Sequence, residues 1–219
     1  MSQPGMDADT FEQFIEQLDR YVRERLIPAE RETIEHDRIP DDILQEMKDM
    51  GLFGLTVPEE YGGAGLNITQ YARTVRCMGY AAPAFRSIFS INVGMFNSAI
   101  KNGGTEAQKA EWWPRIASGA IACFGLTEPG SGSDSAAMQT FARPDPAGNG
   151  WILNGTKRYI TNAPHAEVAL IMARTEKEAL PRNAHVSAFI VPMNTPGVST
   201  GSPDKKMGQA GAHISDVIL

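Results

Sequence analysis

The chain has 219 residues, a formal net charge of −6 and 42% hydrophobic residues, which suffices for one large domain or two modest ones. The acidic balance argues against a nucleic-acid surface, which requires clustered Lys and Arg, and no apolar run reaches the roughly 18 residues of a membrane span. The short, polar start at residues 1–9 resembles neither a signal nor a transit peptide.

Cysteine and histidine usage indicates a reduced, metal-free protein. Cys77 and Cys123 lie inside apolar patterns, so we predict buried thiols and a cytoplasmic location. The four histidines are scattered without the spacing of metal ligands, so no metal site is predicted.

Helical periodicity dominates the first half of the chain. Thr10 and Gln13 have the spacing of a capping box, and the apolar residues from Phe11 to Leu26 recur at helical intervals. A second helix is predicted to begin at Pro40 and to end at Gly51. The Gly-rich residues 57–66 cannot form a regular element.

Three further helices are predicted before residue 119. Asn67 caps the first, whose expected buried face carries Ile68, Tyr71, Val75 and Met78. The second, from Pro83 to Asn102, is apolar nearly all round, which is typical of a helix in the middle of a bundle. Thr105 and Gln108 form the capping box of the third.

The composition changes near Gly119, so we predict a helical domain over residues 1–119 and a β-domain over residues 120–219. Asn154-Gly155 is a strong hairpin signal, and Thr175–Ala184 is predicted to be a charged surface loop. Short strands with Gly and Pro turns favour a mostly antiparallel β-barrel or sandwich, which makes the fold class α+β. The expected strands are Ala120–Leu126, Gln139–Arg143, Trp151–Leu153, Lys157–Thr161, Val168–Ala173, Val186–Pro192 and His213–Leu219.

The stretch Leu126–Asp134 carries the chemistry that the sequence suggests. Its glycines allow close backbone approach, and the hydroxyls of Thr127, Ser131 and Ser133 can converge on a phosphate or a flavin edge. Local composition by itself favours a polar turn after a strand. A Rossmann motif is excluded because Ser135 takes its last Gly position, no Gly-x-Ser-x-Gly elbow is present, and a P-loop would need Lys157 one position earlier.

Several segments together resemble the acyl-CoA dehydrogenase family. Cys123–Asp134 resembles its flavin-binding signature, and Leu153–Asn162 resembles its Asn-Gly-x-Lys-x-Trp-Ile-Thr-Asn segment. Pro58–Gly63, Gly104–Lys109 and Lys205–Gly208 also fit in family order. The resemblance covers nearly the whole chain after the first dozen residues.

The resemblance implies that the N-terminal helical domain and most of the middle β-domain are present. In the family, a C-terminal helical bundle follows and carries the catalytic glutamate, so the base is expected beyond Leu219. The apolar strand at the end of the chain has no turn after it, which predicts a piece of a longer protein whose last strand is left with an exposed edge.

The resemblance also assigns cofactor contacts by position. Thr127 and Thr161 would hydrogen-bond the flavin, Gly132 and Ser133 would approach the phosphate and acyl-thioester region, and Tyr159 stands where the family mostly has Trp. Core packing, a cross-strand aromatic and ordinary strand residues are the structural alternatives. Glu128 is predicted to shape its loop, and no catalytic residue is assigned. The cofactor-binding set is Phe124, Leu126, Thr127, Gly132, Ser133, Tyr159, Ile160 and Thr161, with Ser133 also at the substrate.

The resemblance implies an FAD-dependent enzyme that desaturates an acyl-CoA thioester at the α,β bond. It further implies an electron-transfer flavoprotein-type acceptor and a homo-oligomer. Residues 1–219 alone are expected to be inactive and to hold FAD weakly. A flavin monooxygenase or oxidase on the same fold, and a non-catalytic binding or scaffold chain, remain as alternatives.

Overall fold

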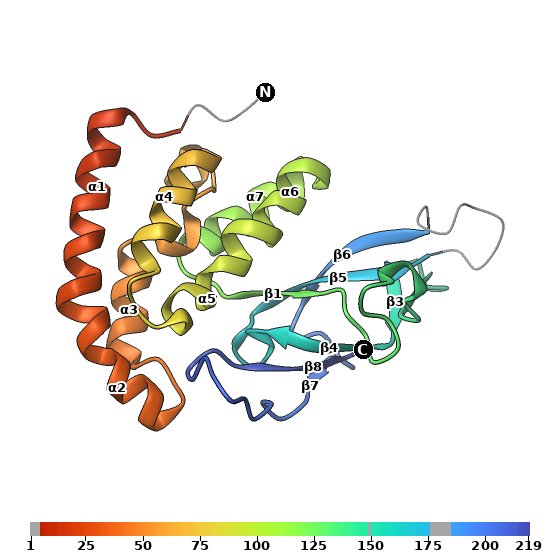
Figure 1. The fold of residues 1–219 in the computed structure, drawn as a ribbon. Coiled ribbons are helices and arrows are strands. Elements are labelled where there is room, and N and C mark those ends of the chain that lie inside the picture. The colour runs from red at the N-terminus through yellow and green to blue at the C-terminus, as the bar shows by residue number, and fades with distance from the viewer. Residues whose placement is uncertain (1–4, 149, 176–184) are drawn as a thin grey trace. The chain divides into compact units, whose positions relative to one another are not determined.

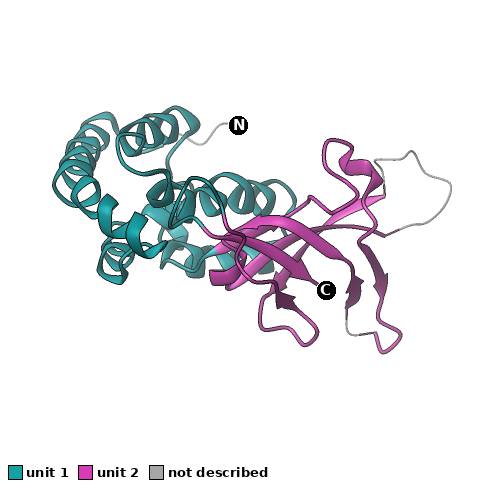
Figure 2. Ribbon diagram, turned by 60° about the horizontal axis from the view of Figure 1, so that its bottom comes forward, with its two compact units in different colours: residues 1–121, 206–212 teal, residues 122–205, 213–219 magenta. Residues whose placement is uncertain are grey.

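The computed structural model describes residues 5–148, 150–175 and 185–219, whose elements are labelled in Figure 1. The chain forms two compact units, one of residues 1–121 with 206–212 and one of residues 122–205 with 213–219 (Figure 2). The first unit is helical and the second is built from β-strands. An α+β fold with a helical N-terminal domain is therefore confirmed.

The first unit begins with a long helix. Helix α1 (Ala8–Tyr21) continues through a π-helical turn at Val22–Leu26 into α2 (Ile27–His36), so it extends beyond the predicted end at Leu26. The predicted capping box at Thr10 is wrong. Asp7 is the N-cap, and its Oδ1 accepts a hydrogen bond from the Thr10 amide at 3.0 Å. Because Asp7 is itself a strong capping residue, the helix starts three positions earlier than expected.

The other predicted helices form close to their expected bounds. Asn67 and Thr105 both make complete capping boxes, with Gln70 and Gln108 respectively. A second π-helical turn, Asn92–Phe96, separates α5 from α6. The elements are α3 (Asp41–Asp49), α4 (Ile68–Met78), α5 (Pro83–Ile91), α6 (Asn97–Gly103) and α7 (Glu106–Ala117).

The buried face of α4 differs from the predicted apolar face. Ile68 is 78% exposed, whereas Gln70 and Thr74 are buried beside Met78. The Gln70 amide group bonds the backbone of Met6 in both directions, at 3.1 and 2.7 Å. Met78 is thus buried as predicted, but Gln70 takes the inward position that the apolar pattern predicted for Ile68.

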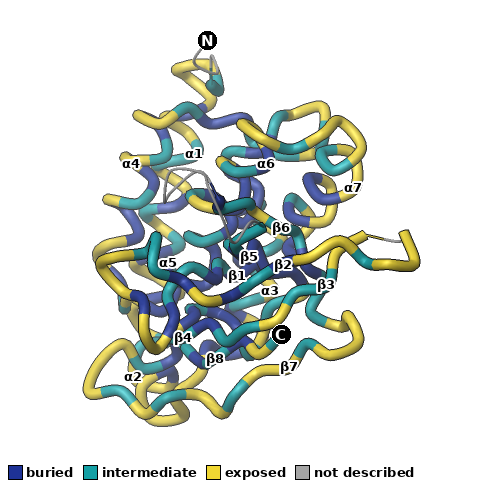
Figure 3. Tube along the Cα trace, turned by 90° about the vertical axis from the view of Figure 1, so that its right-hand side faces the viewer, coloured by how far each residue is buried: buried dark blue, intermediate teal, exposed yellow. Residues whose placement is uncertain are grey.

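Large aromatic side chains fill the core of the helical unit. Phe53, Phe85 and Phe89 are fully buried. Figure 3 colours the chain by how far each residue is buried. Most large apolar side chains of the central segment α5–α6 are buried as predicted, although Met95 remains 47% exposed. The segment 206–212 completes this unit, because the Gly211 amide donates to Asp37 Oδ1 at 2.7 Å. Gly211 has φ +81°, and a Cβ there would lie 2.6 Å from Thr33 Cγ2.

The second unit contains two sheets. Strands β1 (Ala122–Gly125) and β2 (Phe141–Pro144) both pair in parallel with β5 (Val168–Arg174), and β5 pairs antiparallel with β6 (Val186–Pro192). Strand β3 (Trp151–Asn154) completes this five-stranded sheet beside β2. The other sheet has β8 (Ile214–Ile218) between β4 (Thr156–Thr161) and β7 (Ser199–Thr200). The strands of the described residues form no closed barrel, and the pairing is mixed.

Two predicted features of the β-domain are wrong. Asn154-Gly155 does not close a hairpin, because β3 and β4 pair in different sheets. Gly155 lies instead against Thr140, where a Cβ would come within 2.7 Å of the Thr140 Cα, so glycine is required for this close approach. The last strand is not an exposed edge either, since β8 has a partner on each side. The predicted charged loop lies, from residue 176 onward, outside the described residues.

Within the described residues, no helix is long and apolar enough to cross a membrane.

Candidate functional site

A tight turn shapes the loop that follows β1. The backbones of Glu128 and Ser131 bond each other in both directions, at 3.0 and 3.1 Å. The Ser131 hydroxyl is buried and donates to the Asp134 carbonyl at 2.8 Å. The Ser131 hydroxyl therefore uses its proton within its own loop, and its convergence with Thr127 and Ser133 on a ligand stays a prediction.

A buried ion pair fixes the loop to β4. Lys157 Nζ lies 2.7 Å from Glu128 Oε1, and the two side chains are 0% and 5% exposed. The same ammonium donates to the Leu126 carbonyl at 3.2 Å, and Glu128 also accepts the backbone amides of Gln139 and Thr140. Burial by itself raises the pKa of the Glu128 carboxyl, but hydrogen bonds from Lys157 and Thr140 outweigh it and hold that pKa below its ordinary value.

This pair confirms the expectation that Glu128 shapes the loop. A carboxylate that accepts an ammonium and two amides is a poor proton acceptor for substrate. Sequence reasoning missed the role of Lys157, because the alternation of a regular strand does not place it on the same face as Ile160. Lys157 and Ile160 are both buried in one strand at a spacing of three, which strict alternation does not allow.

A β-bulge explains that spacing and re-aims the middle of β4. Lys157 pairs with Val217 and Ile160 with Ser215, so Arg158 and Tyr159 together oppose Asp216. Tyr159 has φ +60°, a left-handed conformation that bulky residues seldom adopt. Its side chain is pushed outward, and the residue is 59% exposed.

The loop and the bulge meet through the backbone. The Arg158 amide donates to the Thr127 carbonyl at 2.8 Å, which places Thr127 beside Tyr159. Thr127 and Thr161 are half-buried, whereas Ile160 is 2% exposed and offers only its backbone. At the end of the strand, Asn162 has φ +67°, and its backbone amide donates to the His213 carbonyl at 2.9 Å.

The remaining predicted residues lie on β1 and its loop. Phe124 and Leu126 are half-buried, whereas Gly132 and Ser133 are exposed. The structure therefore brings Thr127 and the Tyr159 bulge together, and it leaves Gly132 and Ser133 on the outer part of the loop. An exposed aromatic ring beside half-buried hydroxyls and apolar side chains suits a planar aromatic ligand with a polar edge.

Two further kinds of group could add chemistry beside the loop after β1 and the bulge of β4: a reactive thiol and a cluster of metal-binding side chains. Burial raises the pKa of the Cys123 thiol to about 12, so it stays protonated and unreactive. Among the described residues, no cluster of three or more His, Cys, Asp or Glu side chains could hold a metal ion.

The geometry defines an α+β protein of two compact units, whose β-unit joins the bulge of β4 to the loop after β1. The chain matches the acyl-CoA dehydrogenase N-terminal domain over residues 8–120 and the acyl-CoA dehydrogenase middle domain over residues 123–219. It therefore belongs to the acyl-CoA dehydrogenase family, as the sequence motifs predicted.

Curated proteins and solved structures of this family resemble the chain along nearly its whole length. It is 34% identical to the mitochondrial short-chain specific acyl-CoA dehydrogenase of Homo sapiens, covering 96% of this chain and 50% of that protein. A glutaryl-CoA dehydrogenase from Mycobacterium smegmatis in complex with FADH2 has a TM-score of 0.85 and 34% identity, covering 98% of this chain and 53% of that one.

The butyryl-CoA dehydrogenase of Megasphaera elsdenii has a TM-score of 0.89 and 28% identity, covering 98% of this chain and 57% of that one. The chain thus spans about half the length of these relatives.

Proposed function

We propose that this chain supplies the helical and β-domain portion of an FAD-dependent acyl-CoA dehydrogenase, which converts an acyl-CoA thioester to its α,β-unsaturated form. The observation that carries the proposal is the hydrogen bond between the Thr127 loop and the Tyr159 bulge, which joins the two family motifs into one surface. Relatives of similar identity are named for short-chain, glutaryl and butyryl substrates, so the substrate class is acyl-CoA in general.

The donor set of this surface fits a flavin. Thr127 and Thr161 would hydrogen-bond the polar edge of the ring, while Phe124, Leu126 and Tyr159 would contact its apolar part. Gly132 and Ser133 would approach the phosphates and the thioester, and a Cβ at Gly132 would meet no atom within 4 Å, so the loop is open there. Bound FAD supplies the two-electron chemistry, and the protein supplies orientation, hydrogen bonds and exclusion of water.

The base that removes the α proton is a separate requirement. Glu128 is the buried carboxylate of the two flavin-like stretches, 122–134 and 156–162, and Lys157 neutralises it. A general base contributes roughly 10²–10⁴-fold to a rate. Residues 1–219 by themselves are therefore proposed to hold FAD weakly and to show no detectable acyl-CoA dehydrogenation.

The remaining proposals concern partners and location. Reduced flavin must pass its electrons on, and the family resemblance favours an electron-transfer flavoprotein-type acceptor. The family resemblance likewise favours a homo-oligomer. The buried free thiols of Cys77 and Cys123 favour a reducing compartment, for which the cytoplasm is proposed.

The test is an FAD titration monitored by the NMR signals of Thr127, Tyr159 and Thr161, which detects weak binding. The change Thr127→Val should remove one hydrogen bond, worth about 0.5–1.5 kcal/mol, and weaken FAD roughly 2- to 12-fold. Thr195→Val, on an exposed turn of the same unit, is the matched control and should bind FAD like the parent. Unchanged signals at all three residues with millimolar FAD would contradict the proposal and favour a scaffold role.

A second measurement separates the enzyme classes. In the protein that carries this chain, anaerobic acyl-CoA should reduce bound flavin stoichiometrically. A monooxygenase on the same fold would leave the flavin oxidised under these conditions. An oxidase would also be reduced by acyl-CoA, but admitted O2 would then reoxidise its flavin rapidly, whereas a dehydrogenase would react with O2 slowly.

A further inference from the structure

The bulged segment of β4 is held by a group of charges whose residues the family motifs leave unspecified. Arg158 Nη1 donates to Asp216 Oδ1 at 2.7 Å, and its Nη2 donates to Asp204 Oδ1 at 3.2 Å. The three side chains are only 25–30% exposed, so water screens them less than it would screen a fully exposed ion pair. One guanidinium thus bridges two carboxylates from two different segments.

The segment that carries Asp204 is itself anchored to β8, the strand that carries Asp216. The Asp204 amide donates to the Ile214 carbonyl at 2.9 Å, and the Gly201 amide donates to the Asp216 carbonyl at 3.1 Å. The second oxygen of Asp204, Oδ2, is buried and has no hydrogen-bond partner among the described residues. That carboxylate therefore depends on Arg158 for compensation of its charge.

The same guanidinium also stacks on an aromatic ring. Arg158 Cζ lies 4.5 Å from the centroid of the Tyr159 ring, within the range of a cation–π contact. Because Asp204 and Asp216 fix the guanidinium plane, the stacked ring loses freedom as well. A left-handed, exposed tyrosine would otherwise rotate freely about its side-chain bonds.

We propose that Arg158, clamped between Asp204 and Asp216, is a positioning residue that holds the Tyr159 ring as a preformed platform for the aromatic face of the cofactor. This inference rests on the proposed function. The strained backbone of Tyr159 is the cost of aiming the ring outward, and the clamp keeps the ring in place before the ligand arrives. A preformed platform lowers the entropy lost on binding.

The first experiment reads the ring without any ligand. In isotopically labelled protein, the Tyr159 ring signals are assigned with Tyr159→Phe and then followed in Arg158→Met. We expect the ring signals to move toward those of free tyrosine. Arg143→Met, at an exposed arginine of β2, is the matched control and should leave them in place. Unmoved Tyr159 signals in a folded Arg158→Met protein would overturn the clamp.

Arg158→Met leaves two carboxylates close together and could unfold the β-unit. Asp204→Asn is the milder variant, since it keeps the Asp216 contact, and it should broaden the Tyr159 signals. Arg158→Lys keeps the charge but loses the planar fork that holds two carboxylates, so it should behave more like Arg158→Met than like the parent. Full recovery by lysine would mean that charge alone matters and would contradict positioning by geometry.

The second experiment adds FAD and follows Thr161 and Tyr159. Arg158→Met should weaken FAD at least fivefold, with little change at Arg143→Met. If the parent binds FAD and Arg158→Met binds it equally well, the platform is refuted while the proposed function stands. If the parent shows no FAD response at all, the proposed function and the cofactor role of Tyr159 both fail, and the ring signals still decide whether the clamp exists.

Discussion

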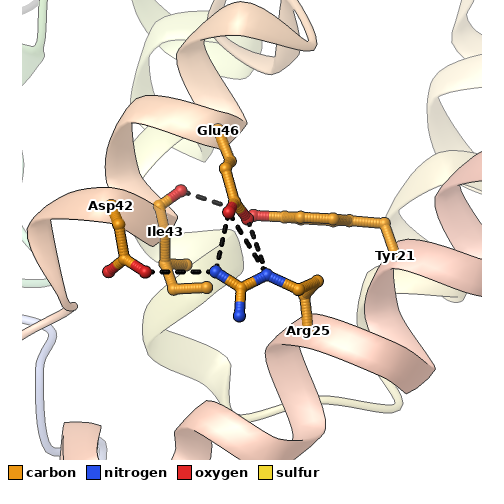
Figure 4. Close-up of polar contacts among 5 residues, drawn as sticks. All are labelled: Tyr21, Arg25, Asp42, Ile43 and Glu46. Atoms are coloured by element: carbon orange, nitrogen blue, oxygen red, sulfur yellow. Dashed lines mark hydrogen bonds and ion pairs between the residues drawn. The ribbon is translucent and has the colours of Figure 1, made fainter.

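The two units of this chain solve the problem of burial in opposite ways. The helical unit keeps its charges outside: Arg25 bonds Glu46 and Asp42 across the surface between its π-helical turn and α3, with Tyr21 alongside (Figure 4). The β-unit places a complete ion pair, Glu128 and Lys157, inside. The buried pair lies at the root of the candidate site, which indicates that the β-unit gives up apolar packing where it must fix a loop.

The largest expected effect comes from breaking the buried pair. Lys157→Met leaves the Glu128 carboxylate buried without its counter-ion, which should destabilise the β-unit by about 3–5 kcal/mol. Hydrogen exchange of β4 and β8 measures this loss separately from that of the helices. The double variant Glu128→Gln/Lys157→Met should recover most of the loss, and failure to recover would show that the pair is not the cause.

A cavity is the corresponding way to break the helical unit. Leu18 in α1 is fully buried, and Leu18→Ala should cost about 2–5 kcal/mol through lost contacts and an unfilled cavity. Hydrogen exchange of α1 and α4 should report the loss. Ile34→Ala, on an exposed face of α2, is the control and should change little. Equal effects of the two variants would contradict the assignment of the core.

The β-unit should also be the more sensitive of the two to mild acid. His165 Nε2 and His213 Nδ1 lie 2.6 Å apart, and burial first, then the charge of His213, lowers the pKa of His165 below its ordinary 6.5. The folded state therefore binds fewer protons than the unfolded state in this window. Stability is complete above about pH 6.5 and falls as the pH drops through the lowered value.

Thermal unfolding between pH 7.5 and 5 measures this dependence. His213→Asn should flatten the curve, whereas His36→Asn, at an exposed position of α2, should not. A parent curve that does not fall toward pH 5 would contradict the prediction.

The smallest effect is expected at the surface cluster of Figure 4. Burial, and then the Glu46 carboxylate, raises the pKa of Tyr21, so this phenol stays neutral at physiological pH. Arg25 itself is well exposed, and exposed ion pairs contribute little because water and salt screen them. Arg25→Met should lower the melting temperature far less than Lys157→Met. The loss caused by Arg25→Met, measured against the parent, should vanish in high salt. A salt-insensitive loss would mean that the Arg25 stem packs against the helices instead.

The difference between these regions also decides what the sequence could predict. The caps at Asn67 and Thr105 depend on residues three positions away, so local pattern was sufficient. The prediction of a hairpin at Asn154-Gly155 was wrong, because the backbone at Gly155 packs against Thr140, which lies in a different part of the chain. Turn propensity contains no information about such a neighbour.

Part of the candidate site could be predicted from sequence motifs, and part of it depends on contacts between distant segments. Family motifs located Thr127 and Tyr159, but no motif revealed that Arg158 would bridge Asp204 and Asp216, since that contact joins three separated segments. The bulge at Arg158-Tyr159 contains no glycine to mark it. The Glu128–Lys157 pair was not predictable from the strand pattern either, because only the bulge brings Lys157 to the same face as Ile160.

Residues 206–212 return to the helical unit, which limits how the gene can be divided to express that unit alone. A gene cut after codon 121 would encode every α-helix of the described residues and still omit the heptapeptide whose Gly211 bonds Asp37. A chimera that exchanges the helical unit between family members must therefore exchange two separate stretches, residues 1–121 and 206–212, to keep that contact matched. A synthetic peptide covering residues 206–212, supplied in trans to the shortened product, would be the corresponding complementation assay.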